Sequence, residues 1–363
     1  ATPEEAQERW HEHFSGLFNI SENTTPQLDG HLQTLQRSAT DEKMDRDFDA
    51  NDMTEALSTL GVKAPGIDGI SMQALKSAVE PGAMKYLLAV VNKVFRTGEV
   101  PPEWKDLVLV PIFKKGLRCL TDNYRGIAII ASFGKLYEKL LQNRLAAHAA
   151  DTPNCIPRSQ FGFTAGRSTA DALFISAQVT EQMNRLNQPL YKLFVDFSKA
   201  YDRVNRAALW RILDIRGVPA KFVEAIKQLH EGAVAHLKIN GKIAPPELAI
   251  PLHVGVKQGS ILAALLFNIF TGAIMEIVER KYLQLRTQAI PIMTGVQFEV
   301  DEYMTDGRVS PRAPTPHKYT ADVNGVGNTA DASATAATPS VGDTNIQQEE
   351  DAHHALAPSR SSA

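Results

Sequence analysis

Two aspartates with a possible chemical role lie close together in the segment LFVDFSKAYDRV of this 363-residue chain. The near neighbours of Asp196 are leucine, valine and phenylalanine, the composition of a buried strand. An unpaired buried carboxylate is costly, so it protonates or acquires a cation. Asp196 is therefore a candidate ligand for a divalent metal ion. The alternative is that it ends the strand and caps a helix that begins near Ser198.

The second aspartate, Asp202, has a simpler interpretation. Lys199 lies three residues before it and Arg206 four residues after it, the spacing of ion pairs on one helix face. We favour these helix ion pairs over a catalytic role for Asp202. Tyr201 is not explained by charge, and a lone aromatic residue in a helix usually packs in the core.

A glutamine and a glycine form a second candidate site in the segment GVKQGSILAALLFNIF. Gln258 and Gly259 form a turn that opens a long apolar helix. Residues 260–275 are uncharged but include Asn268, and they fall short of the roughly 20 apolar residues that span a bilayer. The pattern favours a buried helix, with a membrane-associated helical protein as a remote alternative.

Charge is distributed unevenly along the chain, although its net value is only -3. Residues 1–60 carry 4 basic and 13 acidic side chains, whereas residues 61–286 carry 30 basic and 18 acidic ones. Residues 287–363 carry 4 and 10. A basic body of this kind attracts a phosphate backbone, and the binding weakens with salt. The alternative is an ordinary lysine-rich surface.

Cysteine usage and the first residues indicate the cellular compartment. Cys119 and Cys155 are far apart in the sequence, which predicts neither a disulfide framework nor a thiolate zinc site. The opening segment PEEAQERWHEHFSGLF is acidic and lacks the pattern of a secretory signal. We therefore expect an interior fragment of an intracellular protein, cytoplasmic or nuclear.

The candidate residues must be positioned by alternating helices and strands. Asp52 and Glu55 predict a capped helix, and Asn240-Gly241 predicts a two-residue hairpin turn. Pro245 and Pro246 make the second hairpin strand an edge strand or a bulge. The periodicity predicts helices at 52–60, 71–79, 82–97, 135–149, 169–186, 200–215 and 220–231, and strands at 106–113, 126–132 and 190–197.

Six motifs in a fixed order carry a family resemblance. The segments KAPGIDGI, LVPIFKKG, NYRGIAIIASFGKLYEKLLQNRL, QFGFTAGRSTADAL, LFVDFSKAYDRV and VKQGSILAALLFNIF resemble the reverse transcriptase of LINE-type, non-LTR retrotransposons. The motifs keep the order and approximate spacing of that family over about residues 64–270. A weaker match extends from Glu8 to Leu60.

The resemblance implies an α+β fold, a right-hand polymerase with fingers and palm in which helices back an antiparallel palm sheet. The sequence shows no thumb pattern after these motifs, so we expect the thumb to be lacking. We expect an acidic helical extension at 1–60, fingers and palm at 61–290, a degenerate palm remainder at 291–324 and a disordered low-complexity tail at 325–363. The implied activity is RNA-directed DNA synthesis, with an RNA template, a DNA primer and dNTPs as partners and no membrane.

The resemblance also implies roles for individual residues. Asp196 and the carbonyl of Phe197 match the metal ligands of the palm, which would hold two Mg²⁺ ions, or Mn²⁺ in their place, about 4 Å apart. Tyr201 matches the side chain that lies beneath the incoming sugar and excludes a 2′-hydroxyl. Gln258 and Gly259 match the turn that contacts the incoming nucleotide.

Basic residues match the triphosphate site of the family. Arg125 matches the fingers arginine that grips the triphosphate, a task suited to a bidentate guanidinium group. Lys114 and Lys115 are weaker candidates for the same phosphates, with a solvated basic turn as the alternative. The chain departs from common family residues at Gly126, where relatives carry proline, and at Ser260 and Ala264, where they carry cysteine and proline.

The family next requires the motif Tyr-any-Asp-Asp on a palm hairpin. The segment HKYTADVNGVG lies at a plausible place, with Tyr319 followed by Thr320, Ala321 and Asp322. Because alanine replaces the first aspartate, Asp322 must shift by one residue to supply the second catalytic carboxylate. The alternative is a truncated, catalytically inactive relic that only binds nucleic acid.

Overall fold

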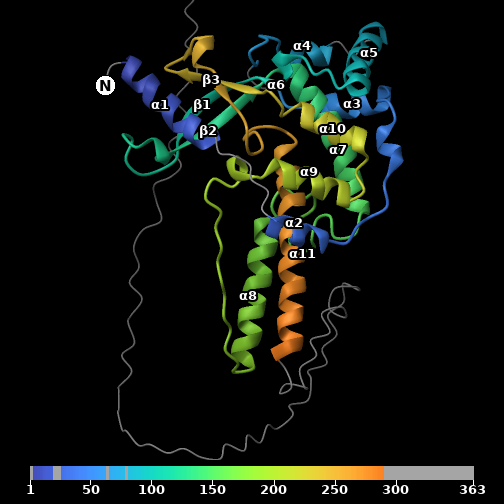
Figure 1. The fold of residues 1–363 in the computed structure, drawn as a ribbon, viewed down its shortest axis with the longest axis vertical. Coiled ribbons are helices and arrows are strands. Elements are labelled where there is room, and N and C mark those ends of the chain that lie inside the picture. The colour runs from blue at the N-terminus through green and yellow to red at the C-terminus, as the bar shows by residue number, and fades with distance from the viewer. Residues whose placement is uncertain (1–2, 19–25, 63–64, 78–80, 290–363) are drawn as a thin grey trace, which may run out of the picture. The chain divides into compact units, whose positions relative to one another are not determined.

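The computed structural model describes residues 3–18, 26–62, 65–77 and 81–289 (Figure 1). All of these residues belong to one compact unit. The predicted palm remainder at 291–324 and the predicted tail at 325–363 lie outside the described residues. The described part combines one mixed sheet with helices, which confirms the expected α+β class.

The sheet has the strand order β2-β1-β3-β4, with β5 also paired to β3. Strands β1 and β2 are antiparallel and confirm the two strands predicted there, whereas β1 and β3 are parallel. The expectation of an antiparallel sheet is therefore wrong for this pair. Parallel neighbours need a long crossover connection, and several helices lie between β1 and β3. The strands are β1 (Leu107–Phe113), β2 (Tyr124–Ile130), β3 (Val234–Ile239), β4 (Lys242–Ile243) and β5 (Ile250–Pro251).

The predicted hairpin at Asn240-Gly241 is present between β3 and β4. Both residues have positive φ, 50° for Asn240 and 81° for Gly241, as a type I′ turn requires. The second hairpin strand, β4, is an edge strand as predicted from Pro245 and Pro246, and the chain after it turns into the short 3-10 helix η4 (Pro246–Leu248). The sequence therefore determined this turn locally.

Helix α1 (Pro3–Phe18) covers one face of the sheet. Its buried side chains Phe14, Leu17 and Phe18 join a cluster with alternate residues of β1, among them Leu107 and Leu109. Alternation places these two leucines on the same face of the strand. The acidic N-terminal segment thus packs against the sheet through an apolar helix face.

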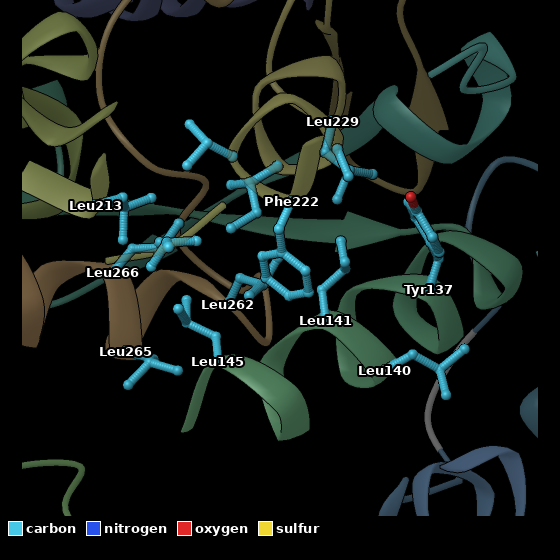
Figure 2. Close-up of a cluster of buried hydrophobic side chains, with 14 of the residues drawn as sticks. Tyr137, Leu140, Leu141, Leu145, Leu213, Phe222, Leu229, Leu262, Leu265 and Leu266 are labelled. Atoms are coloured by element: carbon cyan, nitrogen blue, oxygen red, sulfur yellow. The ribbon is translucent and has the colours of Figure 1, made fainter. Parts of the chain in front are cut away.

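A second and larger core surrounds α7 (Ser132–Asp151), the helix predicted at 135–149. Figure 2 shows Leu141 and Leu145 of α7 facing Phe222 of α10 (Ala220–Gln228) and Leu262, which precedes α11 (Ala263–Ala289). Among the described residues, no helix has the length and hydropathy to cross a bilayer. The other helices are α2 (Pro26–Gln33), α3 (Ala50–Thr59), α4 (Met72–Ser77), α5 (Pro81–Thr97), α6 (Pro102–Lys105), α8 (Thr169–Arg185) and α9 (Arg206–Ile215).

Two helix starts differ from the sequence prediction. Helix α3 begins two residues earlier than predicted, because Asp49 is its N-cap. The Asp52 side chain accepts a hydrogen bond from the Asp49 amide and completes the capping box. The predicted cap at Asp52 and Glu55 is therefore wrong. The helix predicted at 200–215 is split into the 3-10 helix η3 (Tyr201–Arg203) and α9. Asn205 interrupts it by accepting a hydrogen bond from the Ala208 amide.

Residues 65–70 of the KAPGIDGI motif dock on the first turn of α7. The Asp68 carboxylate accepts a hydrogen bond from the Ser132 amide (3.2 Å), and the Ser132 hydroxyl donates to the Ile70 carbonyl (2.6 Å). Only glycine fits at position 66, because a Cβ there would lie 2.5 Å from the backbone of Ala131. The glycine and the aspartate of this motif therefore fasten the loop beside the end of β2.

Candidate active site

Asp196 lies on an irregular, exposed segment and not in a buried strand. Residues 190–197 have no strand conformation, and Leu193 and Phe194 are 88% and 87% exposed. The predicted strand is therefore wrong in this structure. Backbone N–H and C=O groups of a strand need a hydrogen-bonded neighbour, and none of the five strands within the described residues pairs with this segment. Its apolar composition alone could not supply that neighbour.

The exposed segment is attached to α8, and the two run beside each other in Figure 1. The Lys192 ammonium donates hydrogen bonds to the hydroxyls of Ser176 (3.0 Å) and Thr180 (2.6 Å). Helix α8 buries none of its side chains. Asp196 therefore lies on an exposed segment beside α8, where a cation and a substrate could reach its carboxylate.

An aromatic contact connects the Asp196 segment to α11. The rings of Phe197 and Phe267 meet edge to face with centroids 6.2 Å apart, and Tyr201 stacks on Phe267 at 5.0 Å. Burial raises the pKa of the half-buried Tyr201 hydroxyl. Phe267 thus contacts both Phe197 and Tyr201, and the half-buried Tyr201 packs against the core, as the sequence favoured.

The turn η3 is held by the segment that leads to Gln258. The Tyr201 carbonyl accepts from the Val256 amide (2.8 Å), and the Val204 carbonyl accepts from the Gly255 amide (3.0 Å). A Cβ at Gly255 would lie 2.6 Å from the carbonyl oxygen of Asp202, and its φ is +76°. Glycine is therefore needed for the close approach of these two segments.

Gln258 and Gly259 are fastened to β2. The Ala128 amide donates to the Gln258 carbonyl (2.8 Å), and Gly259 has φ +121°. A Cβ on Gly259 would lie 2.5 Å from the Ala128 carbonyl oxygen. Gln258 lines a small cavity together with Gly126 and Asp202. The fold thus joins the two predicted motifs to a third one, the strand that carries Arg125.

The predicted triphosphate residues lie at the end of the β1–β2 hairpin where residues 114–123 connect the two strands. Arg125 is exposed on β2 and pairs in register with Ile112, while Lys114 and Lys115 are exposed in the connection that follows β1. The Lys114 amide donates to Asn123 across that connection (2.9 Å). All three cations face solvent, so a phosphate group can approach them, as the alternative of a solvated basic turn also allows.

The ion pairs predicted between Asp202 and the residues Lys199 and Arg206 do not form, because both basic side chains contact other groups. Lys199 pairs with Asp122 (3.3 Å), and Arg206 donates to the carbonyls of Gly255 (2.8 Å) and Leu252 (2.7 Å). Burial raises the pKa of Asp202 to about 6, and the nearby charges of Lys199, Arg125 and Arg203 only partly offset that rise. The reason for the difference is that η3 is a separate turn and not the first turn of α9.

We expect the Asp202→Asn substitution to change how stability depends on pH. Burial raises the carboxyl pKa from 3.8 to about 6, so the folded protein binds a proton more tightly than the unfolded chain between these values, and wild-type stability falls as pH rises through that window. The variant has no carboxyl group to titrate at this position. Its free energy of unfolding, relative to that of wild type, should therefore rise by about 1–3 kcal/mol from about pH 4 to about pH 7.5. Urea unfolding at both pH values measures the difference. Identical pH dependences would contradict the assigned burial of Asp202.

Buried charges beneath the turn were missed by the sequence analysis. Arg206 is 8% exposed, Lys257 is 5% exposed and Glu138 is 1% exposed. One signal could have identified Glu138, because it lies three residues before Leu141 and seven before Leu145, on the apolar face of α7. No periodic signal marks Arg206 or Lys257, since their carbonyl partners come from distant segments.

The second predicted carboxylate, Asp322, lies outside the described residues. Among the residues that the structure describes, no group of three or more His, Cys, Asp or Glu side chains could hold a metal ion. Mg²⁺ prefers oxygen ligands and binds through one or two carboxylates together with water and substrate phosphates. Asp196 and the carbonyl of Phe197 therefore fit part of such a ligand set.

The family model for reverse transcriptase (RNA-dependent DNA polymerase) matches residues 112–300, more than half of the chain. The chain belongs to the reverse transcriptase family. The matched range contains the β1–β2 hairpin end, the Asp196 segment and the Gln258-Gly259 turn. Reverse transcriptases use divalent metal ions, which agrees with the chemistry of the ligands above.

Curated relatives identify the branch of the family. The chain is 29% identical over 234 residues to the probable RNA-directed DNA polymerase from transposon BS of Drosophila melanogaster, covering 61% of this chain and 24% of the relative. It is 28% identical over 211 residues to the RNA-directed DNA polymerase from mobile element jockey, covering 58% and 22%. It is 30% identical over 213 residues to the probable enzyme from transposon X-element, covering 58% and 22%.

These matches confirm the prediction of a LINE-type, non-LTR reverse transcriptase domain. The jockey and X-element relatives also come from Drosophila melanogaster. The matched part of this chain covers about a quarter of the length of these curated relatives.

Proposed function

We propose that this chain forms the fingers and palm of a LINE-type reverse transcriptase and performs RNA-directed DNA synthesis. It would transfer a nucleotide from a dNTP to the 3′-hydroxyl of a DNA primer on an RNA template. The observation that supports this most is the junction of three distant segments, in which the Gln258-Gly259 turn bonds to Ala128 of β2 while Val256 bonds to Tyr201.

Each segment of this junction would have a separate task. Asp196 and the carbonyl of Phe197 would hold the divalent ion, Mg²⁺ or Mn²⁺, which when bound stabilises the charge of the triphosphate and lowers the pKa of the attacking hydroxyl. Arg125, with Lys114 as a weaker contributor, would grip the phosphates. Gln258 and Gly259 would contact the nucleotide. Catalysis would then depend on placement and charge.

The basic middle of the chain would hold the template and primer. Residues 61–286 have 30 basic and 18 acidic side chains, and Arg125, Lys114 and Lys115 are exposed at the hairpin end. Binding through phosphate contacts releases counterions, so affinity for RNA should fall as salt rises. No membrane is needed for this function.

Primer extension tests the proposal. The full chain, purified, should extend a DNA primer on an RNA template when dNTPs and Mg²⁺ or Mn²⁺ are supplied. Extension on the RNA template supports the proposal, and its complete absence in both metals at every protein concentration refutes it.

A second candidate function is nucleic-acid binding without catalysis. Ala321 stands where the family carries the first aspartate of its Tyr-any-Asp-Asp motif, and Asp322 would have to replace it. Salt-dependent RNA binding by a protein that never extends a primer would favour this inactive relic. The two functions share the basic surface and differ in the metal ligands.

We expect the Tyr201→Ala substitution to raise ribonucleotide incorporation. If the ring lies beneath the incoming sugar, its removal makes room for a 2′-hydroxyl, and the preference for dNTP over rNTP should fall by about tenfold or more. The ratio of the two kcat/KM values measures this within one protein preparation, so any loss of stability from the Phe267 contact cancels.

The Tyr201→Phe variant is the matched control, because it keeps the ring and removes only the hydroxyl. Its sugar preference should equal that of wild type. An unchanged preference in Tyr201→Ala would show that the residue only packs against Phe267.

A further inference from the structure

Glu138 is a buried carboxylate that the proposed reaction does not use. It lies on α7 and is 1% exposed, on the same helix face as Leu141 and Leu145. Those two leucines pack against apolar side chains, as Figure 2 shows for Leu141 and Phe222. An apolar residue at position 138 would suit this core, and apolar replacements of buried ionic groups are often neutral or stabilising. The carboxylate therefore calls for a specific explanation.

The carboxylate of Glu138 contacts the C-terminal end of the Gln258-Gly259 turn. Its Oε2 atom accepts from the Ser260 hydroxyl (2.9 Å) and from the Ile261 amide (3.1 Å). The same hydroxyl accepts from the Leu262 amide (3.2 Å). Glu138 and Ser260 thus satisfy two amides just before α11, where a helix start leaves N–H groups without partners.

A buried lysine holds the beginning of the same turn. The Lys257 ammonium donates to the Lys105 carbonyl (2.9 Å) at the end of α6. Burial raises the pKa of Glu138 and lowers the pKa of Lys257 to about 8, and the opposite charge of each partly offsets the cost of burying the other. Glu138 and Lys257 therefore contact opposite ends of the Gln258-Gly259 turn, and the charge of each favours the ionised form of the other.

The third attachment is the sheet. The Gln258 carbonyl accepts from the Ala128 amide, and Gly259 lies against the Ala128 carbonyl. Gln258 and Gly259 are therefore held from three directions, by Lys257, by β2 and by Glu138. Without the Glu138 attachment, the C-terminal half of the turn would keep only local bonds, such as that from the Ser260 amide to the Lys257 carbonyl (2.9 Å) and that from the Leu262 amide to the Ser260 hydroxyl (3.2 Å).

We propose that Glu138 is a positioning residue, whose contacts with Ser260 and Ile261 set the geometry of the Gln258-Gly259 turn for the incoming dNTP. This inference rests on the proposed function for its consequence in catalysis, and on the contacts alone for its consequence in the turn. A displacement of about 1 Å at a substrate-contacting group can lower a rate by about a hundredfold, so the attachment matters.

Three variants grade the loss of this attachment. Glu138→Leu removes both hydrogen bonds and the charge, Glu138→Gln keeps an acceptor oxygen but removes the charge, and Ser260→Ala removes only the hydroxyl. Leu140→Ala is the control, because this buried residue of the same helix lies away from Leu262 in Figure 2. This variant should destabilise α7 and leave the contacts of the turn in place.

The first measurement is hydrogen exchange of the amides of residues 258–262. Glu138→Leu should accelerate exchange there by about tenfold or more, and Glu138→Gln and Ser260→Ala should accelerate it less. In Leu140→Ala, the exchange rate of these amides relative to the other amides of the chain should equal that in wild type. If Glu138→Leu does not fold, the other variants still test the proposal. Glu138→Gln and Ser260→Ala should then show faster exchange at residues 258–262 than Leu140→Ala.

The second measurement separates KM for the dNTP from kcat in single-nucleotide primer extension. Glu138→Leu should raise KM by about tenfold, with recovery in Glu138→Gln and no change in Leu140→Ala. Unchanged exchange at 258–262 in every Glu138 and Ser260 variant overturns the positioning role. A wild-type protein without primer extension refutes the proposed function instead, and the exchange result still decides the role of Glu138 in the turn.

Discussion

The Asp196→Ala variant should lose primer extension by at least about a thousandfold, because it lacks the carboxylate proposed to hold the divalent ion. The loss should occur without unfolding. Asp196 is exposed, and substitutions at exposed positions usually change stability by no more than about 0.5 kcal/mol. Primer extension on an RNA template and urea unfolding measure the two quantities on one preparation.

Glu181→Ala is the matched control for Asp196→Ala. Glu181 is an exposed carboxylate on α8, paired with Arg185 at 2.6 Å, and it belongs to none of the predicted site residues. This variant should keep full extension and nearly full stability. Equal extension by wild type and Asp196→Ala would remove the assignment of Asp196 as a metal ligand.

The Gly259→Ala substitution should have the second-largest effect, on both stability and nucleotide binding. Alanine disfavours the φ of +121°, and its Cβ would lie 2.5 Å from the Ala128 carbonyl oxygen. The turn must then move away from β2 and lose the bond between the Ala128 amide and the Gln258 carbonyl. We expect a stability loss of about 2–4 kcal/mol and a rise in KM for the dNTP of about tenfold to a hundredfold.

Gly241→Ala separates the backbone strain from the steric clash. Gly241 also has positive φ, +81°, but no atom lies within 4 Å of a Cβ built there. Its substitution should cost about 1 kcal/mol from conformation alone and leave KM unchanged. Equal effects of the two alanine substitutions would contradict the docking of Gly259 on β2.

The exposed Asp196 segment shows a limit of reasoning from hydrophobic pattern. Residues 190–197 have the composition of a buried strand, yet Val195 is 72% exposed and Phe197 is 52% exposed. A strand is a property of a pair, since its backbone groups need a neighbour, and the neighbour cannot be read from the segment itself. The same holds for the parallel pairing of β1 with β3, which joins segments more than a hundred residues apart.

Local chemistry was sufficient for other elements. Strands β1 and β2, helix α7 and the Asn240-Gly241 turn were all predicted from short-range patterns, because each is specified by propensity, periodicity or turn conformation. The cap of α3 was misplaced by three residues, since Asp49 and Asp52 both satisfy the local rule and only the hydrogen bonds choose between them. Local rules thus determined the elements better than their exact ends.

By itself, the sequence determined the family and the residue types of the candidate site, because motif order and short-range propensity are written along the chain. Only the tertiary structure decided which motifs meet, how Gln258 and Gly259 are held, and that Glu138 and Lys257 are buried beneath them. Burial and hydrogen bonding depend on residues brought together from distant segments. The energy of a charge at one position is therefore set by neighbours that a linear pattern cannot specify.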